Sequence, residues 1–179
     1  MRLKAYDYSK AGAYFLTIVT QDRLCLFGDV IEDEMHVNGA GAMVSEVWRQ
    51  LPSRFPTMEL DAFVVMPNHV HGIVALNQPV GVPLVGTQGD GIAKRATTRV
   101  APTLGDVVGA YKSITTLRYT QGVKVGLWQA FRGRLWQRNY YEHVIRNESE
   151  LNKAREYIVG NPALWARDRE NPAVFGDCT

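Results

Sequence analysis

Residues 60–76 read LDAFVVMPNHVHGIVAL, two apolar runs separated by a proline and an asparagine. Both runs have the length and the apolar, partly β-branched composition of strands, and Pro67-Asn68 is a turn signal. We therefore predict a hairpin with strands at 60–66 and 69–76. Because side chains alternate along a strand, His69 and His71 point to one face and Val70 to the other.

The flanking sequence predicts further elements on both sides of this hairpin. Upstream lie a strand at 13–20, short strand-like pieces within 24–37 with a polar turn at 32–34, and a helix at 40–51 that Pro52 and Pro56 bound. Downstream, Thr103 is a plausible N-cap of a helix at 103–119 that Gly122 ends. The stretch 127–145 is aromatic and strand-like in its middle, and Asn147 with Glu150 has the pattern of a capping box for a last helix that stops near 160–162.

The order strand, helix, hairpin, helix, strand, helix predicts an α+β fold. We expect a central antiparallel sheet with two helices on one face and an added C-terminal helix. The 179 residues fit one domain. Within it, residues 77–102 are rich in Gly, Pro, Val and Thr and predict a flexible insertion loop, and residues 166–179 are expected to form a C-terminal tail.

The composition excludes several classes of protein. Hydrophobic residues make up 46% and charged residues 21%, which is ordinary for a globular protein. No apolar run approaches the ~20 residues that span a bilayer, and the N-terminal residues lack a secretory apolar core. These two absences predict a cytoplasmic location. Two cysteines suggest neither a disulfide framework nor a cysteine-rich zinc site.

Positive charge is concentrated in residues 91–139. The whole chain has a net charge of only +2, but this segment holds nine Lys or Arg and one acid, so its charge is +8 and that of the remainder is −6. A basic block on a near-neutral chain favours a nucleic-acid partner, with a solvated helix face as the alternative. Aromatic residues are interleaved with the cations, and bases stack on such rings while cations contact phosphates.

The histidine pair suggests a metal site but needs a third ligand. Two solvent-facing strand histidines are the simpler interpretation. A third ligand is available in the last helix, where Tyr157 and Asn161 are four residues apart and share a face, with Lys153 one turn earlier. A tyrosine hydroxyl beside a metal-held phosphate is a reasonable nucleophile. The alternative is that Tyr157 packs the helix and Asn161 is a C-terminal cap before Pro162.

Other tyrosines compete for the role of nucleophile. Tyr111 and the pair Tyr140-Tyr141 have no amide or carboxylate four residues on, so we interpret them as core or DNA-stacking residues, with Tyr141 the better DNA contact. His143 lies two residues beyond Tyr141, where it could contact phosphate or satisfy a local backbone or carboxylate group.

Three motifs together resemble a known family. Residues 66–71, MPNHVH, resemble the HUH motif, two histidines around a bulky apolar residue. Residues 136–147, WQRNYYEHVIRN, and 155–162, REYIVGNP, resemble signatures of the REP-associated tyrosine transposases, a branch of the single-tyrosine HUH enzymes. The resemblance covers roughly residues 10–165.

This resemblance implies a ferredoxin-like fold and a set of roles. Tyr157 would be the catalytic tyrosine, and His69, His71 and Asn161 would be the metal ligands, for Mg²⁺ or Mn²⁺; ligand softness alone would favour zinc or another metal that prefers imidazole. The substrate would be hairpin or single-stranded DNA of REP type, cleaved and rejoined through a 5′-phosphotyrosine. We expect DNA contacts from Lys112, Arg118, Arg132, Arg134, Arg138, Tyr141, His143 and Lys153.

Several alternatives remain at this stage. A domesticated member would hold hairpin DNA or structured RNA without cutting it, although the intact set of four site residues argues against this. Replication initiators and relaxases carry the same motif but are usually larger. The resemblance is compatible with a bacterial, nucleoid-associated monomer or homodimer, and the DNA target sequence stays open.

Overall fold

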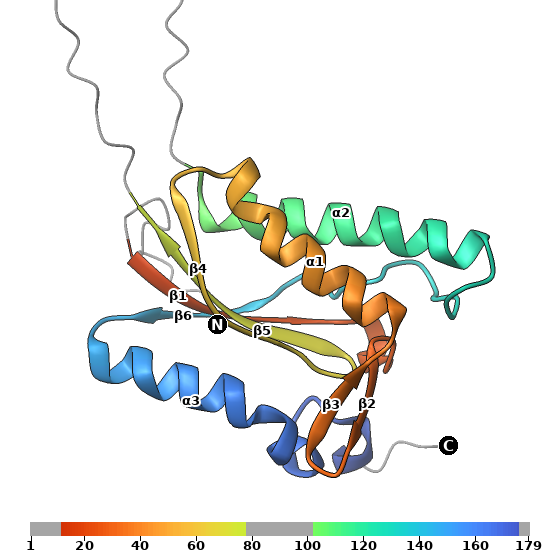
Figure 1. The fold of residues 1–179 in the computed structure, drawn as a ribbon. Coiled ribbons are helices and arrows are strands. Elements are labelled where there is room, and N and C mark those ends of the chain that lie inside the picture. The colour runs from red at the N-terminus through yellow and green to blue at the C-terminus, as the bar shows by residue number, and fades with distance from the viewer. Residues whose placement is uncertain (1–11, 78–101, 176–179) are drawn as a thin grey trace, which may run out of the picture.

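The computed structural model describes residues 12–77 and 102–175 and consists of a four-stranded antiparallel sheet between two helical layers (Figure 1). The strand order is β4-β5-β1-β6. The sheet and its helices are β1 (Gly12–Val19), α1 (Gly39–Arg54), β4 (Met58–Val65), β5 (His69–Leu76), α2 (Leu104–Lys124), β6 (Tyr141–Ile145) and α3 (Glu148–Leu164). This order and connectivity confirm the predicted ferredoxin-like α+β fold.

Helices α1 and α2 cover one face of the sheet, and α3 covers the other (Figure 1). The main core lies under α1 and α2, where Trp48 stacks on Phe63 with ring centroids 4.7 Å apart and meets Tyr111 edge-on. Under α3 the apolar cluster is much smaller and centres on three isoleucines, Ile73, Ile145 and Ile158. The α3 face of the sheet therefore has room for polar side chains.

A small hairpin is inserted between β1 and α1, as the strand-like pieces in 24–37 predicted. It consists of β2 (Gly28–Ile31) and β3 (Glu34–Val37), which pair only with each other. The two turn residues, Glu32 and Asp33, have φ of 50° and 64°. Positive φ at both positions is the mark of a type I′ turn, whose twist suits a two-residue hairpin loop.

Two helix starts match their predictions. Thr103 caps α2 and forms a reciprocal capping box with Asp106. Asn147 caps α3 by accepting a hydrogen bond from the Glu150 backbone N–H, although the Glu150 carboxylate accepts from Arg146 N rather than from the cap residue itself.

Several predicted boundaries are wrong. Pro52 lies inside α1, and α2 continues through Gly122 to Lys124, because the missing side chain of Gly122 makes room for the Trp128 ring rather than ending the helix. A Cβ there would lie 2.2 Å from that ring. In the stretch 127–145 the strand occupies only the end, and α3 passes Pro162 to end at Leu164.

The predicted insertion loop and the predicted C-terminal tail compare differently with the structure. Most of the predicted insertion at 77–102 falls outside the described residues. Part of the expected C-terminal tail is folded: two short 3₁₀ helices, η2 (Trp165–Arg167) and η3 (Pro172–Phe175), follow α3, and Asp168 between them is buried. A third, η1 (Gln21–Arg23), follows β1. No helix of the described ranges has the length and apolar character needed to cross a membrane.

Candidate active site

The two histidines of β5 point to the α3 face of the sheet and are buried. His69 pairs with Val19 of β1 and His71 with Thr17, near the end of that strand. Both side chains are almost fully inaccessible, at 0% and 3% exposure, and their Nε2 atoms lie 3.0 Å apart. The interpretation as solvent-facing strand histidines is therefore wrong.

Each imidazole is held from its other ring nitrogen. His69 Nδ1 lies 2.8 Å from Asn68 Oδ1, and His71 Nδ1 lies 2.9 Å from Thr17 Oγ1. Side chains that hold Nδ1 in this way commonly orient histidine ligands of metal ions. The sequence contains both partners, but nothing in its spacing indicated that they contact the histidines.

Burial keeps both imidazoles neutral. It is the main cause that lowers the pKa of His69 and of His71 from 6.5 to about 3. The neighbouring Arg169 lowers both further, and His69 also lowers His71, whereas Asn161 partly offsets the shift at His69 and Asp168 that at His71. Neutral imidazole is the form that binds metal ions.

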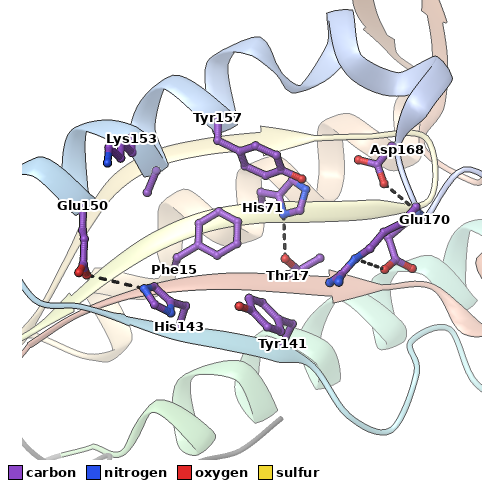
Figure 2. A pocket seen from close by; sticks show the side chains of 12 residues that line it. Phe15, Thr17, His71, Tyr141, His143, Glu150, Lys153, Tyr157, Asp168 and Glu170 are labelled. Carbon is purple, nitrogen blue, oxygen red and sulfur yellow. Dashed lines mark hydrogen bonds and ion pairs between the residues drawn. The ribbon is translucent and has the colours of Figure 1, made fainter.

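Tyr157 and Asn161 project from one face of α3 toward this pair. The Tyr157 ring lies edge-on to the His71 ring, with centroids 5.2 Å apart, and also contacts Phe15 (Figure 2). Burial and the Asp168 carboxylate raise the pKa of the Tyr157 phenol, while the Asn161 side chain lowers it. The Tyr157 phenol therefore lies next to the histidine pair, as the interpretation of the sequence requires.

Asn161 is not a helix cap, because α3 continues past it to Leu164. Its side chain is fully buried, and its Nδ2 donates to Asp168 Oδ2 over 3.4 Å. Its Oδ1 accepts no hydrogen bond from any residue in the described part of the chain. A buried amide oxygen without a donor is unfavourable by about 1–3 kcal/mol, and such an atom calls for a functional explanation.

Asp168 is a site residue that the sequence analysis missed. Its Oδ2 lies 3.9 Å from His69 Nε2, and its Oδ1 accepts a hydrogen bond from Glu170 N at 2.7 Å. Ligand atoms of His69, His71 and Asp168 all lie within 4.8 Å of one another, so this buried group could bind a metal ion. Asp168 follows the last helix in an irregular segment, where neither periodicity nor a motif marks it.

A cleft of about 550 Å³ opens beside the histidine pair (Figure 2). Three of the residues predicted to contact DNA line it: Tyr141 and His143 from β6, and Lys153 from α3. Figure 2 also shows that the His143 imidazole faces Glu150, at 3.7 Å. Phe15 and Arg169, which the sequence analysis did not single out, complete an aromatic and cationic wall, with the Arg169 guanidinium over the Tyr141 ring.

Comparison with known proteins finds two similar sequences and a solved structure of the same fold. No model of a protein family matches the chain. A Haemophilus influenzae protein named "Uncharacterized protein" is 36% identical over 175 residues, covering 94% of this chain and 90% of the relative. A second protein from the same organism, named "Putative REP-associated tyrosine transposase", is 25% identical over 162 residues, covering 87% of this chain and 73% of its own length.

Among solved structures, that of a REP-associated tyrosine transposase bound to a REP hairpin has the same fold. The TM-score is 0.51 at 20% sequence identity, and the match covers 91% of this chain and 73% of the other. The chain is thus similar in sequence to a protein named "Putative REP-associated tyrosine transposase" and has the fold of a solved REP-associated tyrosine transposase. The match to the first relative likewise extends over nearly the whole chain.

The basic residues predicted to contact DNA lie on different parts of the fold within the described ranges. Lys112 donates to three backbone carbonyls, of Gln137, Arg138 and Asn139, and burial lowers its pKa to about 8. Arg118 faces Gln50 and Glu46 on the layer of α1 and α2, across the sheet from α3. Lys94, Arg95 and Arg99 lie outside the described residues.

Three other residues predicted to contact DNA lie in one loop. Arg132, Arg134 and Arg138 are exposed in the loop that connects α2 to β6. This loop passes the end of β1 near the histidines: Gln21 N donates to Leu135 O, and Gln137 N donates to Val19 O. The competing Tyr111 is fully buried in the core, where burial raises its pKa well above 10.

Proposed function

We propose that this protein cuts and rejoins single-stranded DNA next to a hairpin, with Tyr157 as nucleophile. The observation that carries the proposal is the position of the Tyr157 ring against His71, beside a buried set of potential metal ligands. The hairpin substrate is supported by the relatives, since the similar solved structure is of a transposase bound to a REP hairpin.

The residues present suit a divalent metal ion. The pair His69 and His71 would hold it with Asn161 and Asp168, a donor set of two imidazole nitrogens, an amide oxygen and a carboxylate oxygen. Adjacent ligands of an octahedral ion at about 2.1 Å lie about 3.0 Å apart, which is also the distance between the two Nε2 atoms. The two oxygen ligands favour Mg²⁺ or Mn²⁺ over zinc. When bound, such an ion polarises the scissile phosphate and neutralises charge that develops on it.

The single strand would occupy the cleft that Tyr157 lines. Phe15 and Tyr141 offer ring surfaces on which bases stack, and Lys153 and Arg169 place positive charge near the phosphates. The hairpin stem would then lie against the exposed arginines of the loop between α2 and β6, because this loop passes the same end of the sheet. Lys112 would act indirectly by holding that loop through three carbonyls.

The reaction would conserve the energy of the bond that is cut. The Tyr157 oxygen attacks phosphorus, a P–O bond to tyrosine forms, and the bond to the 3′-oxygen breaks; that oxygen takes up a proton from water and becomes a free 3′-hydroxyl. The raised pKa of Tyr157 means that the phenol is neutral beforehand, so its proton leaves as the bond forms and passes to solvent through the open cleft. Attack of a 3′-hydroxyl on the phosphotyrosine reverses the sequence and rejoins the strand.

A single chain supplies every residue of this proposed site. Tyr157 faces the histidines of its own sheet, so no tyrosine from a second subunit is needed, and we propose that the monomer is competent for cleavage.

The proposal is tested by trapping the covalent intermediate. A hairpin oligonucleotide with a labelled single-stranded flank is incubated with the protein and Mn²⁺, and the sample is denatured before electrophoresis. We expect a denaturation-resistant adduct with the wild type and with Tyr141→Phe, and none with Tyr157→Phe, which should still bind the hairpin. An adduct with Tyr157→Phe would refute the assignment, and wild type that binds the hairpin without ever forming an adduct would point to a non-cleaving binding protein.

A further inference from the structure

Asn68 stands directly before the histidine pair and is completely buried. Its Nδ2 donates to two backbone carbonyls, Arg23 O at 3.0 Å and Glu170 O at 2.7 Å. Carbonyl oxygens only accept hydrogen bonds, so the amide cannot be turned around without placing its oxygen against both of them. The orientation of the Asn68 side chain is therefore fixed by the backbone.

This fixed orientation determines where His69 carries its hydrogen. Asn68 Oδ1, which can only accept, faces His69 Nδ1 at 2.8 Å, so Nδ1 must be the protonated nitrogen. A neutral imidazole has one N–H, and its Nε2 is then an unprotonated acceptor. That atom points at His71 Nε2, 3.0 Å away, and toward Asp168.

We propose that Asn68 is a positioning residue that locks His69 in the Nδ1–H form and thereby keeps the Nε2 lone pair directed into the candidate metal site. The inference rests on the proposed function only in taking a divalent ion as the group that this lone pair binds. Neither the comparisons nor the ligand set assigns a role to Asn68.

His71 is not locked in the same way. Its Nδ1 faces the Thr17 hydroxyl, which can donate or accept a hydrogen bond. In the metal-free protein, a hydrogen on His71 Nε2 satisfies the contact with the bare His69 Nε2. When a cation occupies the site, that hydrogen leaves Nε2, and Thr17 can rotate to accept from Nδ1. Asn68 thus keeps the hydrogen of His69 on Nδ1 in both states, whereas the hydrogen of His71 can move between its two ring nitrogens.

The same amide also connects the histidine strand to the segment that supplies Asp168. Glu170 O accepts from Asn68, and Glu170 N donates to Asp168 Oδ1. The carboxylate is in this way tied to the residue next to His69. Loss of Asn68 should therefore disturb both the imidazole and the carboxylate side of the site.

The test uses two measurements on the full chain, neither of which involves DNA cleavage. Long-range ¹H–¹⁵N spectra distinguish the two neutral forms of histidine, and the His69 signal is assigned from its loss in His69→Gln. We expect His69 in the Nδ1–H form both without metal and with Mg²⁺, whereas His71 changes from Nε2–H to Nδ1–H when Mg²⁺ is added. Mn²⁺ affinity is measured by calorimetry in parallel.

Asn68→Ala should give a mixture of His69 forms and weaken Mn²⁺ binding by about 10–100-fold, the usual effect of losing such a partner. Asn171→Ala is the matched control: this asparagine is also buried, and among the described residues its side-chain amide hydrogen-bonds to Trp165 O and Ala173 N. It should leave both measurements unchanged. Equal losses of Mn²⁺ affinity in the two variants would mean that Asn68 is merely structural, which overturns the proposal.

One outcome keeps the proposal testable even if Asn68→Ala does not fold. Wild-type His69 in the Nε2–H form overturns it outright. Because none of these results depends on a DNA adduct, a failure of the cleavage proposal is recognised separately.

Discussion

Replacement of Asn161 by leucine should raise the free energy of unfolding of the metal-free protein and abolish the further stabilisation that a bound metal ion gives. Asn161 is fully buried on α3, and its Oδ1 accepts no hydrogen bond from the residues in the described ranges. Leucine has the same branching and the same number of side-chain heavy atoms as asparagine, is bulkier, and carries no polar atom. The variant therefore removes the unpaired oxygen without opening a large cavity.

The magnitude follows from two opposing contributions. Relief of a buried unpaired oxygen is favourable by about 1–3 kcal/mol. The hydrogen bond lost from Nδ2 to Asp168 spans 3.4 Å, which is long, so its loss costs at most about 1 kcal/mol. We expect the free energy of unfolding to rise by about 1 kcal/mol in EDTA. Free metal at 100 times its Kd stabilises the wild type by about 2.7 kcal/mol, which reverses the order of the two proteins.

Urea denaturation of both proteins in EDTA and in Mn²⁺, followed by circular dichroism, measures these differences. The control is Asn152→Leu, which places leucine on an exposed position of the same helix and should leave the gain from Mn²⁺ intact. The reasoning fails if Asn161→Leu is less stable than wild type in EDTA, or if Mn²⁺ stabilises the variant as strongly as the wild type.

Three other predictions follow from separate parts of the structure. In filter-binding assays with hairpin DNA, Arg134→Ala should lower the slope of log Kd against log salt by about 1, whereas Arg49→Ala on α1 should leave this slope unchanged. Equal slopes for the two variants would mean that the loop does not contact phosphates. Gly72→Ala places a Cβ 2.4 Å from the Trp48 ring and should destabilise the fold by about 1–3 kcal/mol in urea titrations, whereas Gly109→Ala, whose Cβ meets nothing within 4 Å, should not; equal effects would remove the packing argument. Arg155 holds α3 to β4 by hydrogen bonds to both oxygens of Asp61 and thereby lowers the pKa of that carboxyl, so its stabilisation is complete above about pH 4 and is lost as the pH falls through the folded-state pKa. In urea titrations, the difference in unfolding free energy between wild type and Arg155→Met should therefore shrink toward pH 2. A difference that stays constant with pH would contradict this.

The parts of the fold that could be predicted are those that depend on neighbours in sequence. Two apolar runs around Pro67-Asn68 predicted the hairpin, and alternation along a strand predicted the common face of His69 and His71. The caps Thr103 and Asn147 marked two helix starts. Boundaries were missed where a distant residue decides them. Gly122 has the sequence signature of a helix end, yet Trp128 packs on it and the helix continues. Asp168 and Asn68 could not be recognised for the same reason, since their contacts join strand β5 to a segment about 100 residues later.

The candidate site differs from the rest of the molecule because it contains several polar groups whose burial is unfavourable for each of them alone. Two imidazole nitrogens lie 3.0 Å apart at a place where burial prevents either ring from carrying charge. An amide oxygen without a donor and a buried carboxylate lie beside them. Each of these features disfavours folding, and hydrogen bonds among the described residues relieve only some of the conflict. A divalent cation could satisfy these groups at once, because each of them has a lone pair to donate and the ligand atoms of His69, His71 and Asp168 lie within 4.8 Å of one another. The physical reason to propose a metal ion next to Tyr157 is that several buried electron-pair donors lie there together, rather than any single distance.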